Sequence, residues 1–428
     1  MASPTLLLVN KYYHDRGPAG GVGRYLLQEE EDLQRAGWNV VPFAMADADA
    51  RPGPWREHFV RARDYSRARW SRAALGDAAS LVWNREAARR LDGLIRAARP
   101  DVAHLHNVYH HLSPSILPVL ARHRIPAAMT LHDLRLLCPA IHMLRRGQLC
   151  ERCRGGRFHQ AVLGACVKES RAASLLAAVE TAHQRWRRLY ERHVAVFLCP
   201  SRFLLEKHVA WGFAPDRLRH LPNFVDTGWW RPPPDAAPVE DAYLYFGRLS
   251  REKGLTTLLE AHARWEAAGP GTVEGEPPHP DGPPHLWIAG SGPQEDELRR
   301  RSGELRLRRV EFLGSLEREE LRRRLWRCRF TVIPSEWYEN APMAVLESLA
   351  AGRPVVGTSL GGIPELVQDG RTGVLAPARD PAALLQALRR ARALPSEAAT
   401  AARLWAETHA RRDQHMERLA EILAGLAV

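Results

Sequence analysis

Short apolar runs alternate along the chain with longer segments in which apolar residues recur at helical spacing. In the first half, these runs predict strands at residues 4–10, 38–44, 101–105, 126–131 and 194–199. In the second half, they predict strands at residues 242–246, 286–290, 309–313, 330–334, 354–357 and 373–375. Strands that alternate with helices are typical of βαβ units and a parallel sheet. The predicted fold class is therefore α/β, with two Rossmann-like, doubly wound parallel sheets on either side of a cleft.

A proline-rich tract, WRPPPDAAPVED at residues 230–241, separates the two halves. Its prolines prevent a helix and favour an extended linker. The chain has 428 residues, which is more than a domain with a single hydrophobic core usually contains. We therefore predict an N-terminal domain at 1–225 and a C-terminal domain at 226–400, followed by a helical segment at 401–428 that packs back on the first domain.

The composition is that of a globular protein, with 45% hydrophobic and 26% charged residues. No apolar run approaches the roughly 18 residues of a membrane-spanning helix. The N-terminal run TLLLVN is short and is followed by Lys11, which favours a buried strand over a secretory signal. We therefore expect a cytoplasmic protein. The excess of 61 basic over 49 acidic side chains attracts anions such as nucleotides, phospholipid surfaces or nucleic acid.

A glycine-rich loop, GPAGGVGRY at residues 17–25, follows the first predicted strand and leads into a helix. Glycines let the backbone approach a ligand closely, and a helix N-terminus favours an anion. A plain strand-to-helix turn is the alternative. The pattern GxGxxG is absent, and no acidic residue after strand 38–44 is placed to bind a ribose, which argues against a dinucleotide site.

A basic turn, YFGRLSREKG at residues 245–254, follows the first strand of the second half. Arg248 and Lys253 in this turn can neutralise a diphosphate without a metal ion. The alternative is a solvated basic turn.

Two glutamates flank the start of a helix in SEWYENAPMAVLESLA, residues 335–350. We predict that the helix starts near Asn340 as the N-cap, with Pro342 in its first turn. Glu339 and Glu347, about two turns apart, are acceptors for the hydroxyl groups of a sugar and a ribose. A capping glutamate with a second, exposed helix glutamate is the alternative. The glycine-rich loop, the two cations and the two carboxylates all follow predicted strands. This shared placement favours one ligand that contacts all of them.

The motifs taken together resemble the retaining glycosyltransferases of the GT-B fold, in the glycogen-synthase-like family 4. The matching stretches, from about residue 17 to about 375, are GGVGRY, TLHD, PSRF, LPNFVD, FGRLSREKG, IAGSGP, FLG, ENAPMAVLE and GGIPELV. One departure is the tetrapeptide that starts at Glu339. The usual EGFG is here Glu-Asn-Ala-Pro, so that Pro342 removes one backbone donor.

The resemblance implies a role for each matching residue. It assigns donor binding to Gly20, Gly21, Arg248, Lys253, Gly290, Glu339, Asn340, Ala341, Met343 and Glu347. It assigns catalysis to His132, Glu339, Arg248 and Lys253, with His132 touching the sugar from the N-terminal side. The implied reaction moves a sugar from a nucleotide-sugar donor to a saccharide or lipid-linked acceptor, with retention of configuration. It needs neither a catalytic metal nor a protein nucleophile, and it fits surface-polysaccharide or glycoconjugate synthesis.

Four of the six cysteines crowd one segment at residues 138–166. Cys138, Cys150, Cys153 and Cys166 include a Cys-x2-Cys pair, which suits tetrahedral zinc in a structural role. Reduced thiols and an iron–sulfur cluster are the alternatives. A subgroup of family 4 is similar to this chain here too, through HLHNVYHHLSPS, MTLHDLRLLCP and the cysteines that follow.

Residues 51–70 interleave arginines with Trp55, Phe59, Tyr65 and Trp70. This pattern predicts peripheral contact with the anionic headgroups of the inner face of a membrane, or with a phosphorylated acceptor. A basic helix packed on the sheet is the alternative. Three other functions stay open: a sugar-nucleotide epimerase, a non-catalytic protein that binds sugar nucleotides, and a basic zinc protein that binds nucleic acid. No stretch resembles a helix that reads nucleic acid, and we expect no nucleic-acid partner.

Overall fold

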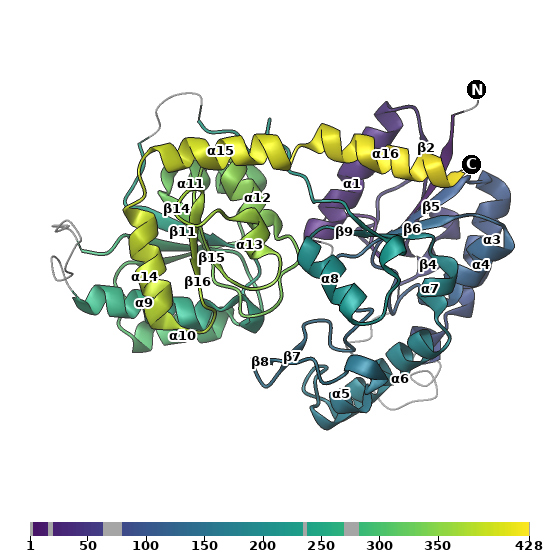
Figure 1. Ribbon diagram of the computed structural model, residues 1–428, viewed down its shortest axis with the longest axis horizontal. Helices are drawn as coiled ribbons and strands as arrows, with labels where there is room; N and C mark the ends of the chain where they lie inside the picture. The colour runs from purple at the N-terminus through teal and green to yellow at the C-terminus, as the bar shows by residue number, and fades with distance from the viewer. Residues whose placement is uncertain (1–2, 16–19, 63–78, 234–237, 269–281, 428) are drawn as a thin grey trace. The chain divides into compact units, whose positions relative to one another are not determined.

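The computed structural model describes residues 3–15, 20–62, 79–233, 238–268 and 282–427 (Figure 1). The chain forms two compact units. Unit 1 comprises Met1–Leu221 and Asp413–Val428, and unit 2 comprises Pro222–Arg412. Each unit is built around a six-stranded sheet in which all neighbouring strands are parallel. The predicted fold class, two Rossmann-like parallel-sheet domains, is thereby confirmed.

The sheet of unit 1 has the strand order β10-β9-β6-β5-β1-β2. Its strands are β1 (Thr5–Val9), β2 (Asn39–Phe43), β5 (Val102–Leu105), β6 (Ala127–Thr130), β9 (Val196–Cys199) and β10 (Leu218–His220). The central strands are apolar at nearly every position, and Leu6 to Val9 are at most 1% exposed. Continuous apolar runs of this kind are expected in parallel strands that helices cover on both faces.

The helices of unit 1 follow its strands in the sequence, except α16, which comes after unit 2 at the C-terminal end. They are α1 (Gly20–Arg35), α3 (Arg85–Ala98), α4 (Leu117–Arg122), α5 (His159–Leu163), α6 (Arg171–Trp186), α7 (Leu189–His193), α8 (Arg202–Ala210) and α16 (Arg412–Ala427). Side-chain caps fix several starts, as where Asn84 accepts the backbone N–H of Ala87 at 3.0 Å. The C-terminal helix α16 joins this unit through buried Leu419 and Leu423.

The sheet of unit 2 has the strand order β13-β12-β11-β14-β15-β16. Its strands are β11 (Ala242–Phe246), β12 (His285–Ala289), β13 (Val310–Gly314), β14 (Phe330–Ile333), β15 (Val355–Thr358) and β16 (Gly373–Ala376). Its helices are α9 (Leu255–Ala268), α10 (Glu295–Glu304), α11 (Arg318–Arg327), α12 (Met343–Ala350), α13 (Ile363–Leu366), α14 (Pro381–Arg392) and α15 (Glu397–His409).

Alternate residues of β11 enter two separate cores in unit 2. Leu244 and Phe246 pack in one cluster with residues of α12 and α15. Tyr243 and Tyr245 pack in the other, with residues of α9 and α14. The sheet is therefore covered by helices on both faces, as in a doubly wound fold.

All predicted strands of the two sheets are present within two residues of their predicted ends. The prediction missed the edge strand β10, which has three residues and no apolar run. It also missed the two-residue strands of the pairs β3–β4 (Met45–Ala46, Val60–Arg61) and β7–β8 (Leu144–Arg145, Gln148–Leu149). No described helix combines the length and the apolar character that crossing a bilayer requires.

Candidate active site

The carboxyl edge of the unit 2 sheet gathers the residues predicted to bind the donor. The strand order reverses between β11 and β14, because β12 and β13 lie on one side of that pair and β15 and β16 on the other. Doubly wound sheets bind ligands at such a switch point, outside the carboxyl ends of their strands. Arg248 and Lys253 follow β11, and Glu339 follows β14, so all three reach the same switch point.

Lys253 and Glu339 form the central contact of this edge. The lysine Nζ lies 2.7 Å from the glutamate Oε1, although 86 positions separate the two residues. The Ser335 hydroxyl donates to the same oxygen at 2.6 Å. The Glu339 side chain is 7% exposed and the Lys253 side chain 23%. An ammonium has three donors, so the bond to Glu339 uses only one of them.

Burial by itself raises the pKa of Glu339. The Lys253 ammonium and the hydrogen bonds from Lys253 and Ser335 outweigh burial and hold that pKa below its usual value. Glu339 is therefore ionised at neutral pH and only accepts hydrogen bonds. Such a group is suited to holding the hydroxyls of a neutral sugar.

Two glycines let neighbouring loops press against the segment that carries Glu339. At Gly254, where φ is +72°, an added Cβ would lie 2.0 Å from the Pro334 carbonyl oxygen. At Gly361, where φ is +61°, it would lie 2.1 Å from the Glu339 carbonyl oxygen. Only glycine fits both the conformation and the space. The backbone from Pro334 to Glu339 is thus held from two sides.

The loop after β11 is fixed in the same way by the loop after β12. Gly290 has φ +136°, and an added Cβ there would lie 1.9 Å from the Gly247 carbonyl oxygen. The Leu249 N–H donates to the Ser291 carbonyl at 3.0 Å. Arg248 lies on this braced loop with an exposed side chain, and its carbonyl accepts the Tyr245 hydroxyl at 2.8 Å. A rigid backbone thus carries the exposed guanidinium.

The helix after β14 starts later than predicted. α12 begins at Met343, and Pro342 occupies the N-cap position with ψ 123° and no side-chain cap bond. The prediction that Asn340 caps this helix was wrong, because a residue that precedes proline is disfavoured in the helical conformation. Ala341 is instead held in a loop, where its carbonyl accepts the Asn223 amide at 3.1 Å.

The other predicted donor contacts lie close by in the sequence. Met343 and Asn340 are partly exposed, and Glu347 lies on the second turn of α12 with 5% exposure. Unit 2 therefore holds all of the predicted donor-binding residues except Gly20 and Gly21. Sequence reasoning missed Ser335, which shares the carboxylate of Glu339. Its position four residues before that glutamate was the available signal.

Gly20 and Gly21 begin α1 in unit 1. Gly20 has φ +48°, and no atom lies within 4 Å of where its Cβ would be. The first turn of this helix contains no acidic side chain, and its backbone N–H groups have no partner within the helix. This arrangement is compatible with an anion. Residues 17–19 of the predicted glycine loop lie outside the described residues.

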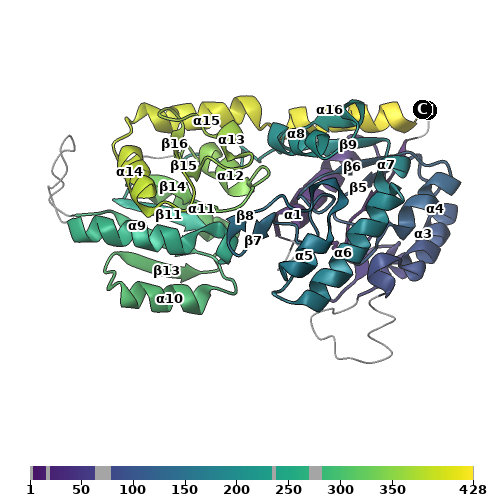
Figure 2. The same ribbon diagram turned by 60° about the horizontal axis from the view of Figure 1, so that its bottom comes forward.

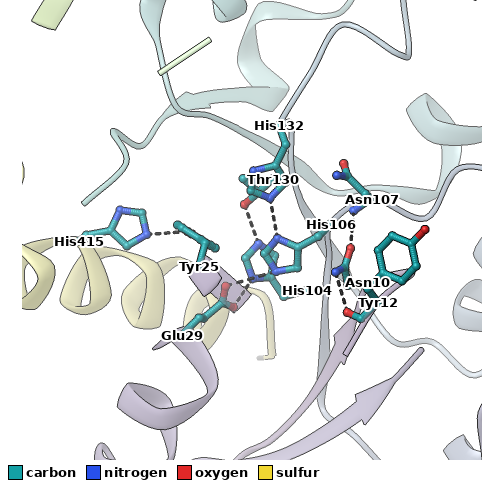
Figure 3. Close-up of polar contacts among 10 residues, drawn as sticks. All are labelled: Asn10, Tyr12, Tyr25, Glu29, His104, His106, Asn107, Thr130, His132 and His415. Carbon is teal, nitrogen blue, oxygen red and sulfur yellow. Dashed lines mark hydrogen bonds and ion pairs between the residues drawn. The ribbon is translucent and has the colours of Figure 1, made fainter. Parts of the chain in front are cut away.

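His132, just after β6, joins a buried polar cluster that sequence reasoning did not identify (Figure 3). Its Nε2 lies 2.9 Å from Nδ1 of His106, and burial lowers the pKa of His132 well below its usual value. Glu29 and His104 complete the core of the cluster. The available signal was HLHN at 104–107, since residues two apart in a strand share a face.

The four clustered cysteines surround the β7–β8 hairpin and α5, which lies beside α6 (Figure 2). Burial, with smaller contributions from the other three thiols, raises the pKa of Cys153 to about 12. Cys138, Cys150 and Cys166 are therefore among the groups that affect the pKa of Cys153. In the described part of the chain, the one group whose three potential ligand atoms lie within 4.8 Å of each other is Glu29, His104 and His106, and not the cysteines.

The predicted membrane-contacting segment is only partly described, because residues 63–70 lie outside the described residues. Within the described part, Phe59 is 2% exposed and packs edge-on against Tyr13, with 5.8 Å between ring centroids. Phe59 is therefore a core residue and not a lipid contact. Trp55 precedes a short 3-10 helix at Arg56–His58.

Comparison with protein families assigns both halves of the chain to glycosyltransferases. The family model described as Glycosyltransferase Family 4 matches residues 19–229, and that described as Glycosyl transferases group 1 matches residues 240–393. Glycogen synthase of Mycobacterium tuberculosis is 31% identical over 304 residues, or 69% of this chain. The match spans 61% of the length of that protein. The GDP-mannose-dependent alpha-(1-6)-phosphatidylinositol monomannoside mannosyltransferase of Mycolicibacterium smegmatis is 28% identical over 294 residues, covering 62% of this chain and 74% of that protein.

Solved structures share this fold over nearly the full length of the chain. Sucrose-phosphate synthase from Thermosynechococcus elongatus aligns over 99% of both chains with a TM-score of 0.69 and 20% identity. Anabaena Alr3699/HepE, solved in complex with UDP and glucose, aligns over 99% of this chain and 100% of its own, with a TM-score of 0.65 and 16% identity. At these identities the likeness concerns the fold.

Proposed function

The chain is a family-4-like protein of the GT-B glycosyltransferase class, and from this premise we propose that it transfers a sugar from a nucleotide-sugar donor to a saccharide or lipid-linked acceptor. The proposal includes retention of the anomeric configuration and a place in surface-polysaccharide or glycoconjugate synthesis. The observation that carries it is the Lys253–Glu339 contact at the switch point of the unit 2 sheet. The GDP-mannose and UDP in the names of the related proteins support a nucleotide-linked donor.

Each group at the unit 2 edge has a role in this proposal. Arg248 and Lys253 bind the diphosphate, Glu339 accepts hydrogen bonds from the sugar hydroxyls, and Glu347 accepts them from the ribose. Departure of the nucleoside diphosphate builds negative charge, which fixed cations stabilise before the reaction starts. These two side chains provide the charge, so the proposal needs no catalytic metal. Gly20, Gly21 and His132 are proposed to contact the donor phosphate or sugar, as the resemblance implies.

A donor screen tests the activity. A panel of nucleotide sugars is first ranked by the thermal shift that each produces, and the best donors are then offered with saccharide and lipid-linked acceptors. We expect sugar transfer and a product with the anomeric configuration of the donor. Tight donor binding without turnover with any acceptor would favour a non-catalytic binding protein. Conversion of the donor to an epimer would favour an epimerase.

The two glutamates separate binding from turnover. We expect Glu347→Ala to weaken nucleotide binding, and Glu339→Ala mainly to lower kcat, because the two carboxylates hold different ends of the donor. Isothermal titration with the nucleoside diphosphate and steady-state kinetics measure the two effects. Glu320→Ala, which removes an exposed glutamate of α11, is the control. Equal and negligible effects of both active-site variants would contradict these roles.

A lipid-linked acceptor is supported by the outer face of α6, which we infer contacts an anionic membrane. Leu175, Val179 and Trp186 are 54%, 48% and 79% exposed, and their spacing of four and seven residues places them along one side of the helix. Exposed Lys168 and Arg171 flank one end, and the Arg187 guanidinium lies 5.6 Å from the Trp186 ring centroid at the other. An apolar stripe between cations fits the lipid headgroup boundary.

Vesicle sedimentation tests this contact. We expect binding to vesicles that contain phosphatidylserine, and weaker binding to pure phosphatidylcholine, because the flanking cations need anionic headgroups. The double variant Leu175→Ser/Trp186→Ser should lose most of the binding. Leu404→Ser, at a position on α15 that is 55% exposed, should not. A change in oligomeric state without any loss of vesicle binding would instead identify the stripe as a subunit interface.

We also propose that the four clustered cysteines bind one structural zinc ion. The Cys-x2-Cys spacing of Cys150 and Cys153 and the affinity of thiolates for zinc support this proposal. Native mass spectrometry of protein produced with zinc should show one zinc per chain, lost in Cys150→Ser and retained in Cys199→Ala. A stably folded chain that takes up no zinc would contradict it.

A further inference from the structure

A network of imidazoles around one buried carboxylate leads from the core of unit 1 to His132 (Figure 3). Tyr25 and Glu29 come from α1, His104 and His106 from the end of β5, and Thr130 and His132 from the end of β6. His415 comes from α16. Glu29, His104 and His106 are fully buried. The network thus lies at the carboxyl ends of neighbouring strands, where this fold class places its ligands.

Glu29 is the acidic member of the network. Its Oε1 lies 2.5 Å from Nδ1 of His104, and its Oε2 lies 3.2 Å from Nε2 of His106. Burial alone would raise the pKa of Glu29, but the two imidazoles outweigh it and hold that pKa far below its usual value. A carboxylate is therefore present, and an ionised carboxylate only accepts hydrogen bonds. Each imidazole nitrogen that faces it must carry a hydrogen.

The hydrogen on Nε2 of His106 decides what its other nitrogen does. Burial, together with nearby His104, lowers the pKa of His106, so this ring is neutral at neutral pH. A neutral imidazole has one N–H. Nε2 of His106 and Oε2 of Glu29 do not meet in hydrogen-bond geometry, but a carboxylate oxygen 3.2 Å away favours the hydrogen on that nitrogen over the other. Nδ1 of His106 is then an acceptor, and it lies 2.9 Å from Nε2 of His132. The hydrogen of that bond consequently belongs to His132.

We propose that Glu29, acting through His106, fixes His132 as the neutral tautomer with its hydrogen on Nε2. Nδ1 of His132 then carries no hydrogen and can only accept a hydrogen bond. The inference rests on the proposed function in one respect, namely that a sugar hydroxyl is the donor His132 meets. Glu29 and His106 are positioning residues, because they act through His132.

Aromatic packing keeps the rings in this arrangement. The Tyr25 ring lies edge-on to His106 and His132, with centroid separations of 5.7 and 5.5 Å. Its hydroxyl lies 2.7 Å from Nε2 of His415. His104 is held at its other nitrogen by Thr130, with 2.8 Å between Nε2 and Oγ1. A ring flip of His106 would place carbon atoms where its two nitrogens lie and break both of its contacts, so the packing preserves the arrangement.

The tautomer is measurable without any substrate. Full-length protein labelled with 15N-histidine is studied by long-range 1H–15N correlation at pH 7.5, where the two ring nitrogens of each tautomer differ in chemical shift. His132→Asn and His106→Asn assign the signals. We expect His132 to show hydrogen on Nε2 alone. A hydrogen on Nδ1, or a charged ring, would overturn the proposal.

Glu29→Gln tests the origin of that tautomer, with Glu30→Gln as the matched control. Glu30 is the next residue of α1, and its carboxylate accepts the Tyr13 hydroxyl at 2.6 Å. A glutamine offers one acceptor and one donor to the two histidines, so the His132 signal should shift or split in Glu29→Gln. It should stay unchanged in Glu30→Gln. An unchanged signal in both variants would overturn the role of Glu29.

Kinetics and metal analysis complete the test. We expect Glu29→Gln to lower kcat by about tenfold, the effect of one misdirected neutral hydrogen bond, with the KM for the donor changed less. If the wild-type protein transfers no sugar, the proposed function fails, while the NMR result still decides the tautomer. Glu29, His104 and His106 also bring three potential ligand atoms within 4.8 Å. A stoichiometric transition metal that persists in Cys153→Ser but disappears in His104→Asn would overturn the proposal.

Discussion

Unit 1 and unit 2 each bury a glutamate beside the carboxyl edge of a parallel sheet, and they stabilise it by different means. Glu339 in unit 2 meets a full cation, the ammonium of Lys253, at 2.7 Å. Glu29 in unit 1 meets two imidazoles and is fully buried. The Lys253 side chain is 23% exposed, and its ammonium has donors for a further ligand. The imidazoles of unit 1 instead fix which nitrogen of the neighbouring ring carries a hydrogen. One edge is thus suited to meeting charge, and the other to orienting a neutral group.

Removal of the Lys253 ammonium should have the largest effect on sugar transfer and on the stability of unit 2. Lys253→Ala leaves Glu339 buried without its partner and removes a diphosphate contact, so we expect transfer to fall by about 10²–10³-fold. We also expect unit 2 to lose roughly 3 kcal/mol of stability, since an unpaired buried charge is costly. Activity assays and denaturant unfolding measure the two effects.

The control for this variant is Lys207→Ala in unit 1. It breaks a lysine–glutamate pair of similar length, 2.6 Å, with Glu151. The Glu151 side chain is 33% exposed, so the loss should be less than about 1 kcal/mol. Similar losses in the two lysine variants would show that burial of Glu339 does not matter.

The close approach of Gly361 to the Glu339 backbone should give the next largest effect. Gly361→Ala and Gly370→Ala both place a side chain at positive φ, +61° and +77°. An added Cβ at 361 would collide with the Glu339 backbone, whereas nothing lies within 4 Å at 370. We expect Gly370→Ala to cost about 1 kcal/mol for the left-handed conformation alone. Gly361→Ala should cost more and should also lower transfer. Equal losses of stability in the two variants, measured by thermal unfolding, would show that the Gly361 contact does not restrain the Glu339 backbone.

The next largest effect should come from acid, which should reduce the contribution of Glu339 to the stability of unit 2. Its pKa is lowered in the folded state, so the contact stabilises unit 2 above the pKa of the unfolded chain. That stability is lost as the pH falls from the usual glutamate value through the lowered one. The difference in unfolding free energy between wild type and Glu339→Gln should therefore be largest near pH 7 and should shrink below about pH 4.5. A difference independent of pH would mean that the carboxylate is not ionised in the folded protein.

Salt should produce the smallest effect and separate the two glutamates. The Lys253 side chain is partly exposed, so 1 M salt should reduce the stability cost of Glu339→Gln by a few tenths of a kcal/mol. Glu29 and both of its histidines are fully buried, so the cost of Glu29→Gln should not change with salt. Chemical unfolding in urea at two salt concentrations makes the comparison. Equal salt responses would remove the distinction between the two edges.

The sequence by itself determined the strands, the fold class and the residues at the strand ends. Apolar runs such as TLLLV and AYLYF are legible because strands buried on both faces need apolar side chains at every position. Charged residues in the segments that follow such runs fall at one sheet edge by topology, which is why Arg248, Lys253 and Glu339 were predicted to share a ligand.

Tertiary structure decided which of these groups touch. Lys253 and Glu339 follow different strands and are 86 positions apart in the sequence, and Glu29, on a helix, is 75 positions from His104. No local pattern encodes such pairs, because they depend on strand order and on which face of a helix packs inward. The start of α12 depends on two features. Pro342, visible in the sequence, occupies the N-cap, and a tertiary hydrogen bond from Asn223 to the Ala341 carbonyl holds the preceding residue in a loop. Burial then set the charge states, because the free energy of an ionised group depends on all of its neighbours in space.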